Sequence, residues 1–209
     1  MQAEKKVIEL PTKQEAKVIS TIWPFANDTV EEWAYWNNAF TPDECKEIIR
    51  VGELKGIKQG SVIGDKPIDP KIRECGVGWL YPDDINWAYK RISHIITVLN
   101  NDFFKFDLFG LAEGFQFTKY EAPSNHYSPH TDKYYKGLVR KLSISVQLSD
   151  PQDYEGGQLA LHLGGEPLNT PNEQGKLIAF PSYTMHEVKP VTEGTRYSLV
   201  AWVTGAPFK

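Results

Sequence analysis

Residues 126–132, HYSPHTD, contain two histidines and an aspartate close together. In extended backbone, residues two positions apart project from the same side of the chain. His130 and Asp132 can therefore bind one metal ion from a single strand end. An HxD pattern is common by chance, so the hypothesis requires a third ligand elsewhere. His186 is the candidate, because it follows the apolar run 177–181 and precedes a turn that contains Pro190.

Two imidazoles and one carboxylate occupy one face of an octahedral metal and leave the other positions open, which is typical of non-haem Fe(II) oxygenases. Arg196 follows His186 by ten residues. Its planar guanidinium binds carboxylates through two parallel hydrogen bonds and stays charged at any working pH. Asp132 and His186 are far apart in sequence, so the ligands meet only if a sheet folds over on itself, as in a jelly roll.

Composition is that of a globular protein. The 209 residues are 41% hydrophobic and 24% charged, enough to bury a core without disulfides. A net charge of −4 and a pI near 5.8 argue against a nucleic-acid binder, which usually carries a basic face. Cys45 and Cys75 form no CxxC pair, and the N-terminus lacks an apolar signal core. We expect a cytoplasmic protein without a membrane span.

The first half of the chain predicts helices. Thr41 as N-cap, Pro42 at the first position and Glu44 form a capping-box start. A second helix is predicted within 82–101, with Asp83 or Asp84 as its N-cap. Its apolar face is expected to consist of Ile85, Ala88, Ile92, Ile95, Ile96 and Leu99. His94 within that helix is interpreted as an ordinary helix residue.

After about residue 103 the hydrophobic period changes to two. Short alternating runs, 113–120, 137–149, 156–163, 175–182 and 194–203, are separated by turns rich in Gly, Pro, Asp and Asn. Helices followed by strands predict an α+β fold. We expect a double-stranded β-helix (jelly roll) core with N-terminal helices packed against one sheet.

Three regions are predicted. Residues 1–35 form a lead-in and residues 36–110 a helical support region. Within the support region, the Gly- and Pro-rich segment 56–78 is a candidate lid. Residues 111–205 form the jelly-roll domain.

Three stretches together resemble a known family. YEAPSNHYSPHTD, LSISVQLSDPQDYEGGQLAL and HEVKPVTEGTRYSLVAWV look like the 2-oxoglutarate- and Fe(II)-dependent dioxygenases of the prolyl 4-hydroxylase type, with the PKHD-type hydroxylases most similar. The resemblance covers roughly residues 36–205. It implies that His130, Asp132 and His186 bind iron and are catalytic, and that Arg196 binds the distal carboxylate of 2-oxoglutarate.

The resemblance also assigns the neighbouring positions. It implies that Tyr120 hydrogen-bonds to the cosubstrate, that Trp202 lines its pocket and that Tyr127 lies near the substrate. Gln147 stands where some relatives carry a tyrosine that contacts the cosubstrate, which weakens the assignment of that position. Because Asp132 is present, hydroxylation is expected rather than halogenation.

The implied reaction is hydroxylation of an unactivated C–H bond, with a prolyl residue of a peptide or protein as the expected substrate. Fe(II), 2-oxoglutarate, O2 and ascorbate are the implied cofactors and cosubstrates. A free amino acid or a nucleobase is the alternative substrate. A noncatalytic metal-binding jelly roll and a Zn hydrolase are the alternative functions. A binding module has no need of the Arg196 carboxylate clamp, and a hydrolase needs a general base, for which Glu187 points the wrong way. The oligomeric state is left open.

Overall fold

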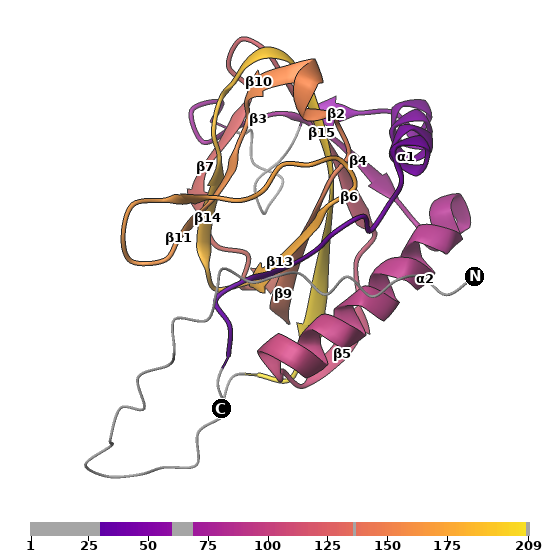
Figure 1. The fold of residues 1–209 in the computed structure, drawn as a ribbon, viewed down its shortest axis with the longest axis vertical. Coiled ribbons are helices and arrows are strands. Elements are labelled where there is room, and N and C mark those ends of the chain that lie inside the picture. Colours follow the sequence, from indigo (N-terminus) through magenta and orange to yellow (C-terminus); the bar gives the residue numbers. More distant parts are fainter. Residues whose placement is uncertain (1–29, 60–68, 136, 208–209) are drawn as a thin grey trace.

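The computed structural model describes residues 30–59, 69–135 and 137–207, and the side chains of 134 and 135 lie outside the description. Two antiparallel sheets lie face to face, and two long helices cover the outer face of the larger sheet (Figure 1). Among the described residues, no helix is long and apolar enough to cross a membrane. The predicted α+β jelly roll with helices against one sheet is confirmed.

The larger sheet has ten strands in the order β1-β13-β9-β15-β6-β4-β2, with β5 and β10 attached to β15 and β8 attached to β9. Its strands are β1 (Ala34–Trp36), β2 (Lys58–Gln59), β4 (Gly76–Leu80), β5 (Leu108–Leu111), β6 (Phe115–Glu121), β8 (Tyr134–Tyr135), β9 (Leu138–Gln147), β10 (Tyr154–Gly156), β13 (Leu177–Pro181) and β15 (Val191–Gly205).

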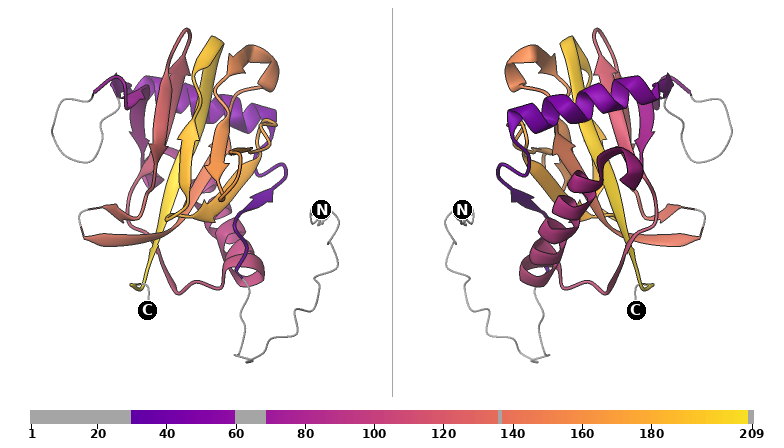
Figure 2. Two further views of the ribbon diagram at one scale, coloured as in Figure 1. Left: turned by 90° about the vertical axis from the view of Figure 1, so that its left-hand side faces the viewer. Right: turned by 90° about the vertical axis from the view of Figure 1, so that its right-hand side faces the viewer.

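The smaller sheet has the order β12-β11-β14-β7-β3. Its strands are β3 (Arg73–Glu74), β7 (His126–His130), β11 (Leu159–His162), β12 (Leu168–Asn169) and β14 (Met185–Val188). Figure 2 shows this sheet on the side of the larger sheet that the helices leave open. The space between the two sheets therefore lies on the face of the larger sheet opposite the helices.

Helix α1 (Pro42–Lys55) begins where the sequence predicts, whereas the N-cap position of α2 (Pro82–Leu99) is Tyr81 and the expected caps Asp83 and Asp84 lie in the first turn. In α1 the Thr41 hydroxyl accepts from the backbone N–H of Glu44, whose carboxylate accepts from the Thr41 N–H, as expected for a capping box. In α2 the Asp84 carboxylate accepts from the backbone N–H of Tyr81. A π-helical turn, η1 (Asn100–Phe104), extends α2, and η2 (Pro151–Asp153) is a 3-10 turn.

Two apolar cores follow from this layering. All six residues of the predicted apolar face of α2 are buried against the larger sheet, whereas His94 is exposed. The second core lies between the sheets and is smaller, with Tyr120, Leu161, Phe180 and Val188 among its members. Charged and polar side chains replace the apolar filling over the rest of that interior, which leaves room for a cavity.

Segment 56–78 differs from the predicted loop. Its described residues carry β2, β3 and the start of β4, which pair with later strands in both sheets. Strands of two to five residues that contain Gly and charge show no period-two alternation, so the sequence did not reveal them. Residues 60–68 lie outside the description, and both the lid and the division into three regions stay predictions.

Candidate metal and cosubstrate site

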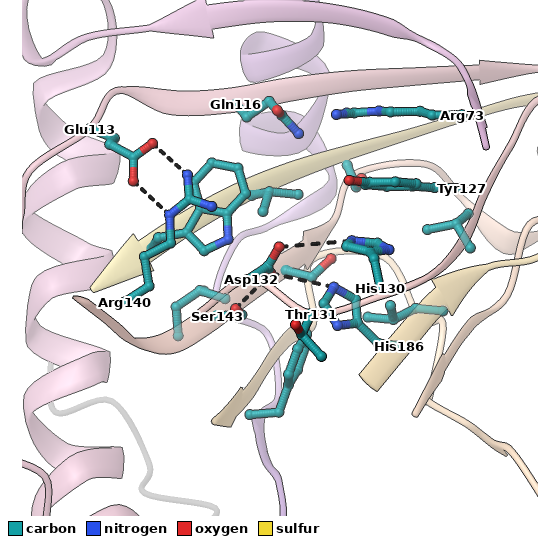
Figure 3. Close-up of a pocket in the computed structure, with 18 of the residues that line it drawn as sticks. Arg73, Glu113, Gln116, Tyr127, His130, Thr131, Asp132, Arg140, Ser143 and His186 are labelled. Carbon is teal, nitrogen blue, oxygen red and sulfur yellow. Dashed lines mark hydrogen bonds and ion pairs between the residues drawn. The ribbon is translucent and has the colours of Figure 1, made fainter. Parts of the chain in front are cut away.

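The smaller sheet brings the three predicted metal ligands together. His130 at the end of β7 pairs directly with His186 on β14, and Asp132 follows β7 by two residues. His130 Nε2 lies 3.8 Å from Asp132 Oδ1, and His186 Nε2 lies 3.4 Å from Asp132 Oδ2. One candidate ligand atom from each residue falls within 4.8 Å of the others (Figure 3). This spacing suits three ligands on one face of a metal ion.

Backbone carbonyls fix both imidazoles in the orientation that metal binding requires. His130 Nδ1 lies 2.8 Å from the carbonyl of Ser128, and His186 Nδ1 lies 3.0 Å from the carbonyl of Thr184. A carbonyl only accepts, so each Nδ1 carries the proton and each Nε2 presents its lone pair to the shared space. Such a bond on the far nitrogen is the usual support of a metal-binding histidine.

Asp132 is held at both its backbone and its side chain. Its N–H donates to the carbonyl of Ser182, and its Oδ2 accepts a 2.7 Å hydrogen bond from the hydroxyl of Ser143. Ser143 and Ser182 are fully buried, and their hydroxyl oxygens lie 3.0 Å apart. A hydroxyl has one proton, so Ser182 donates to Ser143 when Ser143 donates to Asp132. Oδ1 remains for the metal.

The charges of the three ligands are strongly coupled. Burial opposes ionisation of Asp132, yet His186 and His130 beside it hold the pKa of this carboxyl well below its usual range. Burial, reinforced by the neighbouring His186, lowers the pKa of His130 to about 4. Burial also disfavours a charged His186, but contact with Asp132 raises its pKa overall. An ionised carboxylate beside a neutral His130 is the protonation state that a divalent cation requires.

The triad opens into a cavity of about 660 Å³ between the sheets. Tyr120, Tyr127, Arg196 and Trp202, four of the residues expected to contact cosubstrate or substrate, line it. Alternate residues of β9 and β15 also line it, namely Ser143, Ser145, Arg196, Ser198 and Val200. Their apolar neighbours in sequence lie on the other face, in the core under the helices.

Arg196 is a buried cation on the cavity wall. It is 4% exposed, and its Nη1 is buried without a hydrogen-bond partner. Arg196 pairs with Tyr120 across β15 and β6, and its guanidinium lies 5.6 Å from the Tyr120 ring centroid. Gly157, at φ +64°, lies so close that a Cβ there would stand 3.0 Å from Arg196 Cδ. A buried guanidinium with a free N–H fits the carboxylate of a bound dicarboxylate.

Aromatic rings and arginines alternate around the triad. The Tyr127 ring stacks on His130 at 3.5 Å between centroids, and the Arg73 guanidinium lies 4.6 Å above the other face of Tyr127 (Figure 3). Arg140 covers Trp202 at 3.8 Å and pairs with Glu113 through two hydrogen bonds. These arginines fix the rings that flank the metal ligands. Sequence analysis missed Arg73, Arg140 and Glu113, because neither their spacing nor their type marks them.

Other predicted positions lie outside the cavity. The Gln147 amide donates 2.8 Å to the Tyr154 hydroxyl, and Gln147 lines a second, much smaller cavity that Arg196 also borders. His126 lies within hydrogen-bonding distance of the Ser124 and Lys71 carbonyls, and His162 Nε2 lies 3.2 Å from a Glu187 carboxylate oxygen. The structure therefore groups neither of these histidines with the metal ligands.

Comparison with known proteins agrees with this geometry. Residues 115–204 match the family model described as 2OG-Fe(II) oxygenase superfamily. This part of the chain, a little under half of it, is therefore similar to the 2OG-Fe(II) oxygenases. The matched residues include the whole triad, Arg196 and most of the cavity wall.

About half of the chain also has relatives of similar sequence. A PKHD-type hydroxylase of Sphingopyxis alaskensis is 36% identical over 124 residues, which are 56% of either chain. The chain spans about half the length of the curated relatives it matches.

Solved structures share the fold of this chain. A Trichoplax adhaerens prolyl hydroxylase, solved with a hypoxia inducible factor oxygen degradation domain peptide fragment, superposes with a TM-score of 0.71 at 20% identity. The match covers 83% of this chain and 84% of that one. A Pseudomonas putida prolyl-4-hydroxylase gives a TM-score of 0.65 at 20% identity and covers 84% and 94%. At such identities the likeness establishes the fold alone.

Proposed function

We propose that this protein is an Fe(II)- and 2-oxoglutarate-dependent dioxygenase that hydroxylates an unactivated C–H bond of a prolyl residue in a peptide or protein. The substrate and 2-oxoglutarate each receive one oxygen atom of O2, and succinate and CO2 are the co-products. The proposal is carried by one observation, the buried Arg196 with a free N–H in the same cavity as the His130, Asp132 and His186 triad.

The donor set fits Fe(II). Two imidazole nitrogens and one carboxylate oxygen are available on one side of the cavity, and thiols are absent from the described residues that line it. Bound Fe(II) and 2-oxoglutarate supply the oxidation of the C–H bond, and the protein supplies orientation and shielding. The interior position of the triad, between the two sheets, excludes bulk water from the reacting groups.

Arg196 and Tyr120 hold the far end of the cosubstrate. The guanidinium offers a charged donor to a carboxylate. Burial raises the pKa of the Tyr120 hydroxyl, so this group keeps its proton and donates a second hydrogen bond. The two residues stand opposite each other on β15 and β6, which fixes the distance between the donors.

A prolyl substrate is supported by the shape and chemistry of the opening. Trp79 and Tyr81 line the cavity and are 36% and 52% exposed, so an apolar ring passes aromatic surface on its way in. The prolyl hydroxylases of the same fold, one of them solved with a peptide, also favour this substrate class. A free amino acid and a nucleobase are the alternatives that the substrate experiment must include.

The hydrolase alternative receives no support from the cavity. A Zn hydrolase needs a general base near the metal. Glu187 lies within hydrogen-bonding distance of His162 and is not among the residues that line the cavity, and Glu113 is bound by Arg140. A noncatalytic metal-binding module does not require a buried cation that binds a carboxylate, so it does not account for Arg196.

Two further expectations belong to the proposal. A reducing, cytoplasmic setting is supported by Cys45 and Cys75, which are both free and buried. Ascorbate, expected from the family resemblance, is to be included in the assays.

The test is anaerobic addition of Fe(II) and then 2-oxoglutarate, followed by the weak visible charge-transfer band of the chelate. We expect a band in the wild type and none in His130→Ala. Arg196→Ala removes a charged hydrogen-bonding partner, which is worth about 1.5–3 kcal/mol, so half-saturation should need about 10 to 150 times more 2-oxoglutarate. Arg50→Ala, at an exposed arginine of α1 paired with Glu47, is the matched control.

A wild-type band with unchanged 2-oxoglutarate affinity in Arg196→Ala contradicts the assigned carboxylate partner. No band in protein fully loaded with iron contradicts the proposed function, and the binding-module alternative then accounts for the triad.

A further inference from the structure

Gln116 is a polar residue of the cavity wall that neither metal binding nor cosubstrate binding uses. It lies on β6, is 7% exposed and lines the cavity. No hydrogen bond joins its side-chain amide to another described residue, and the amide is not among the buried polar atoms without a partner, so it faces the open space of the cavity. Figure 3 shows the Gln116 side chain pointing from β6 toward the Arg73 side chain. The donors and the acceptor of the Gln116 amide are therefore available to a molecule that enters the cavity.

Strand alternation turns Gln116 toward the cavity. Phe115 and Phe117, its neighbours in sequence, are fully buried in the core under the helices. Side chains on successive strand residues point to opposite faces, so Gln116 shares the inner face with Thr118 and Tyr120. The orientation is therefore set by the hydrophobic pattern of β6.

The register places Gln116 between the bottom of the cavity and its opening. Tyr120, opposite Arg196, lies four residues further along β6, about 13 Å away. Gln116 itself stands between Trp79 on β4 and Val200 on β15. Along β4 the exposed fraction rises from 9% at Val77 to 36% at Trp79. A molecule that enters from solvent toward the triad passes Gln116 before it reaches the cosubstrate end.

The Gln116 amide itself is neutral and can both donate and accept, and the cation Arg73 lines the same cavity near it. Carboxylates are served elsewhere in the cavity, by Arg196 and by the metal. A primary amide offers two N–H donors and one carbonyl acceptor, which matches a peptide group. A prolyl residue has no backbone N–H but keeps its carbonyl, so the complementary contact is Gln116 Nε2–H to a carbonyl oxygen.

We infer that Gln116 is a specificity-determining residue that hydrogen-bonds to a peptide carbonyl of the substrate, beside the prolyl ring that is presented to the triad. The inference rests on the proposed function and narrows it to substrates that carry an amide group. Free proline has no peptide carbonyl, so the contact described here is absent from it.

The test uses capped tetrapeptides, acetylated and amidated, each with one prolyl residue, as probes. Turnover is followed by succinate release and by the gain of one oxygen in the peptide mass. With the best peptide, Gln116→Met should raise the peptide KM about threefold to tenfold, the range of one neutral hydrogen bond. The chelate band and the cosubstrate KM should stay unchanged. Free L-proline should be turned over poorly by both proteins.

Two further variants keep the result interpretable. Gln116→Glu has nearly the same shape but places a carboxylate in the cavity, and it should raise the peptide KM more than Gln116→Met. Gln152→Met changes an exposed glutamine of η2 and should behave as the wild type. Circular dichroism establishes that each variant is folded.

Three outcomes overturn the inference and leave the cofactor assignment intact. The first is a wild-type peptide KM in both Gln116 variants. The second is a change in the cosubstrate KM instead, which would make Gln116 a contact of 2-oxoglutarate. The third is a chelate band without turnover of any peptide. Absence of the band, in contrast, contradicts the proposed function itself.

Discussion

The hydrogen bond from Ser143 on β9 holds the Asp132 carboxylate in the position from which it binds the metal. Ser143→Ala removes the hydroxyl that holds Oδ2 at 2.7 Å, in a place where both residues are buried. A hydrogen bond to a charged group contributes about 1.5–3 kcal/mol. Because about 1.4 kcal/mol corresponds to a factor of ten, the metal dissociation constant should rise about 10- to 150-fold. Loss of an outer-shell partner in other metal sites falls in the same range.

Metal affinity is measured directly, without turnover. Mn(II) is titrated into the apo protein and the free ion is followed by electron paramagnetic resonance, with no 2-oxoglutarate present. Ser143→Thr keeps the hydroxyl and should restore most of the affinity. Ser145→Ala removes a neighbouring hydroxyl from the same face of β9, one that has no contact with Asp132, and should bind Mn(II) as the wild type does.

Wild-type Mn(II) affinity in folded Ser143→Ala would refute the reasoning, because the carboxylate would then hold its position unaided. An equal loss in Ser145→Ala would refute it too, since the effect would then come from a general change in the polarity of the cavity.

Two further changes test the packing around the site. Glu113→Gln leaves the buried Arg140 without its carboxylate and should lower the free energy of unfolding by about 3–5 kcal/mol in urea titrations. If high salt alone lowered the free energy of unfolding of the wild type by the same amount, the Glu113–Arg140 pair would be screened by solvent ions, which would contradict its burial. Gly52→Ala places a Cβ 2.5 Å from the Phe117 ring and should cost about 1–3 kcal/mol by the same measurement. Gly165→Ala, with open space around the new Cβ, is the control, and equal losses in the two would contradict the steric argument.

Local signals predicted the helices well. The capping box at Thr41 needs only neighbouring residues, and the six buried positions of α2 follow from a period that does not depend on the rest of the fold. The long strands β9 and β15 were also visible, since ten and fifteen residues give a clear alternation. The two-residue strands β2 and β3 were not, because their pairing is decided by partners far away in sequence.

The residues of the site also fall into those that the sequence predicts and those that it does not. HxD, a distant His and an Arg ten residues later are readable because their order along the chain is informative, and the cross-strand pair His130 and His186 shows how the fold joins them. Ser143 lies in the alternating run that predicts β9, but its bond to Asp132 depends on how the chain turns after β7. Gln116 lies in an alternating strand, and no sequence motif marks it as a site residue. Its role is visible only from its position on the cavity wall.

Because His130 pairs directly with His186, binding of a metal ion also affects the stability of the smaller sheet. Both residues lie in the smaller sheet, on the adjacent strands β7 and β14, and a bound ion links two points more than fifty residues apart along the chain. Such a link acts as a removable cross-link, because an ion that binds only the folded arrangement stabilises it in proportion to the logarithm of its free concentration. On its other side β7 is held by the two residues of β3. The integrity of the smaller sheet is therefore coupled to the supply of metal, independently of any turnover.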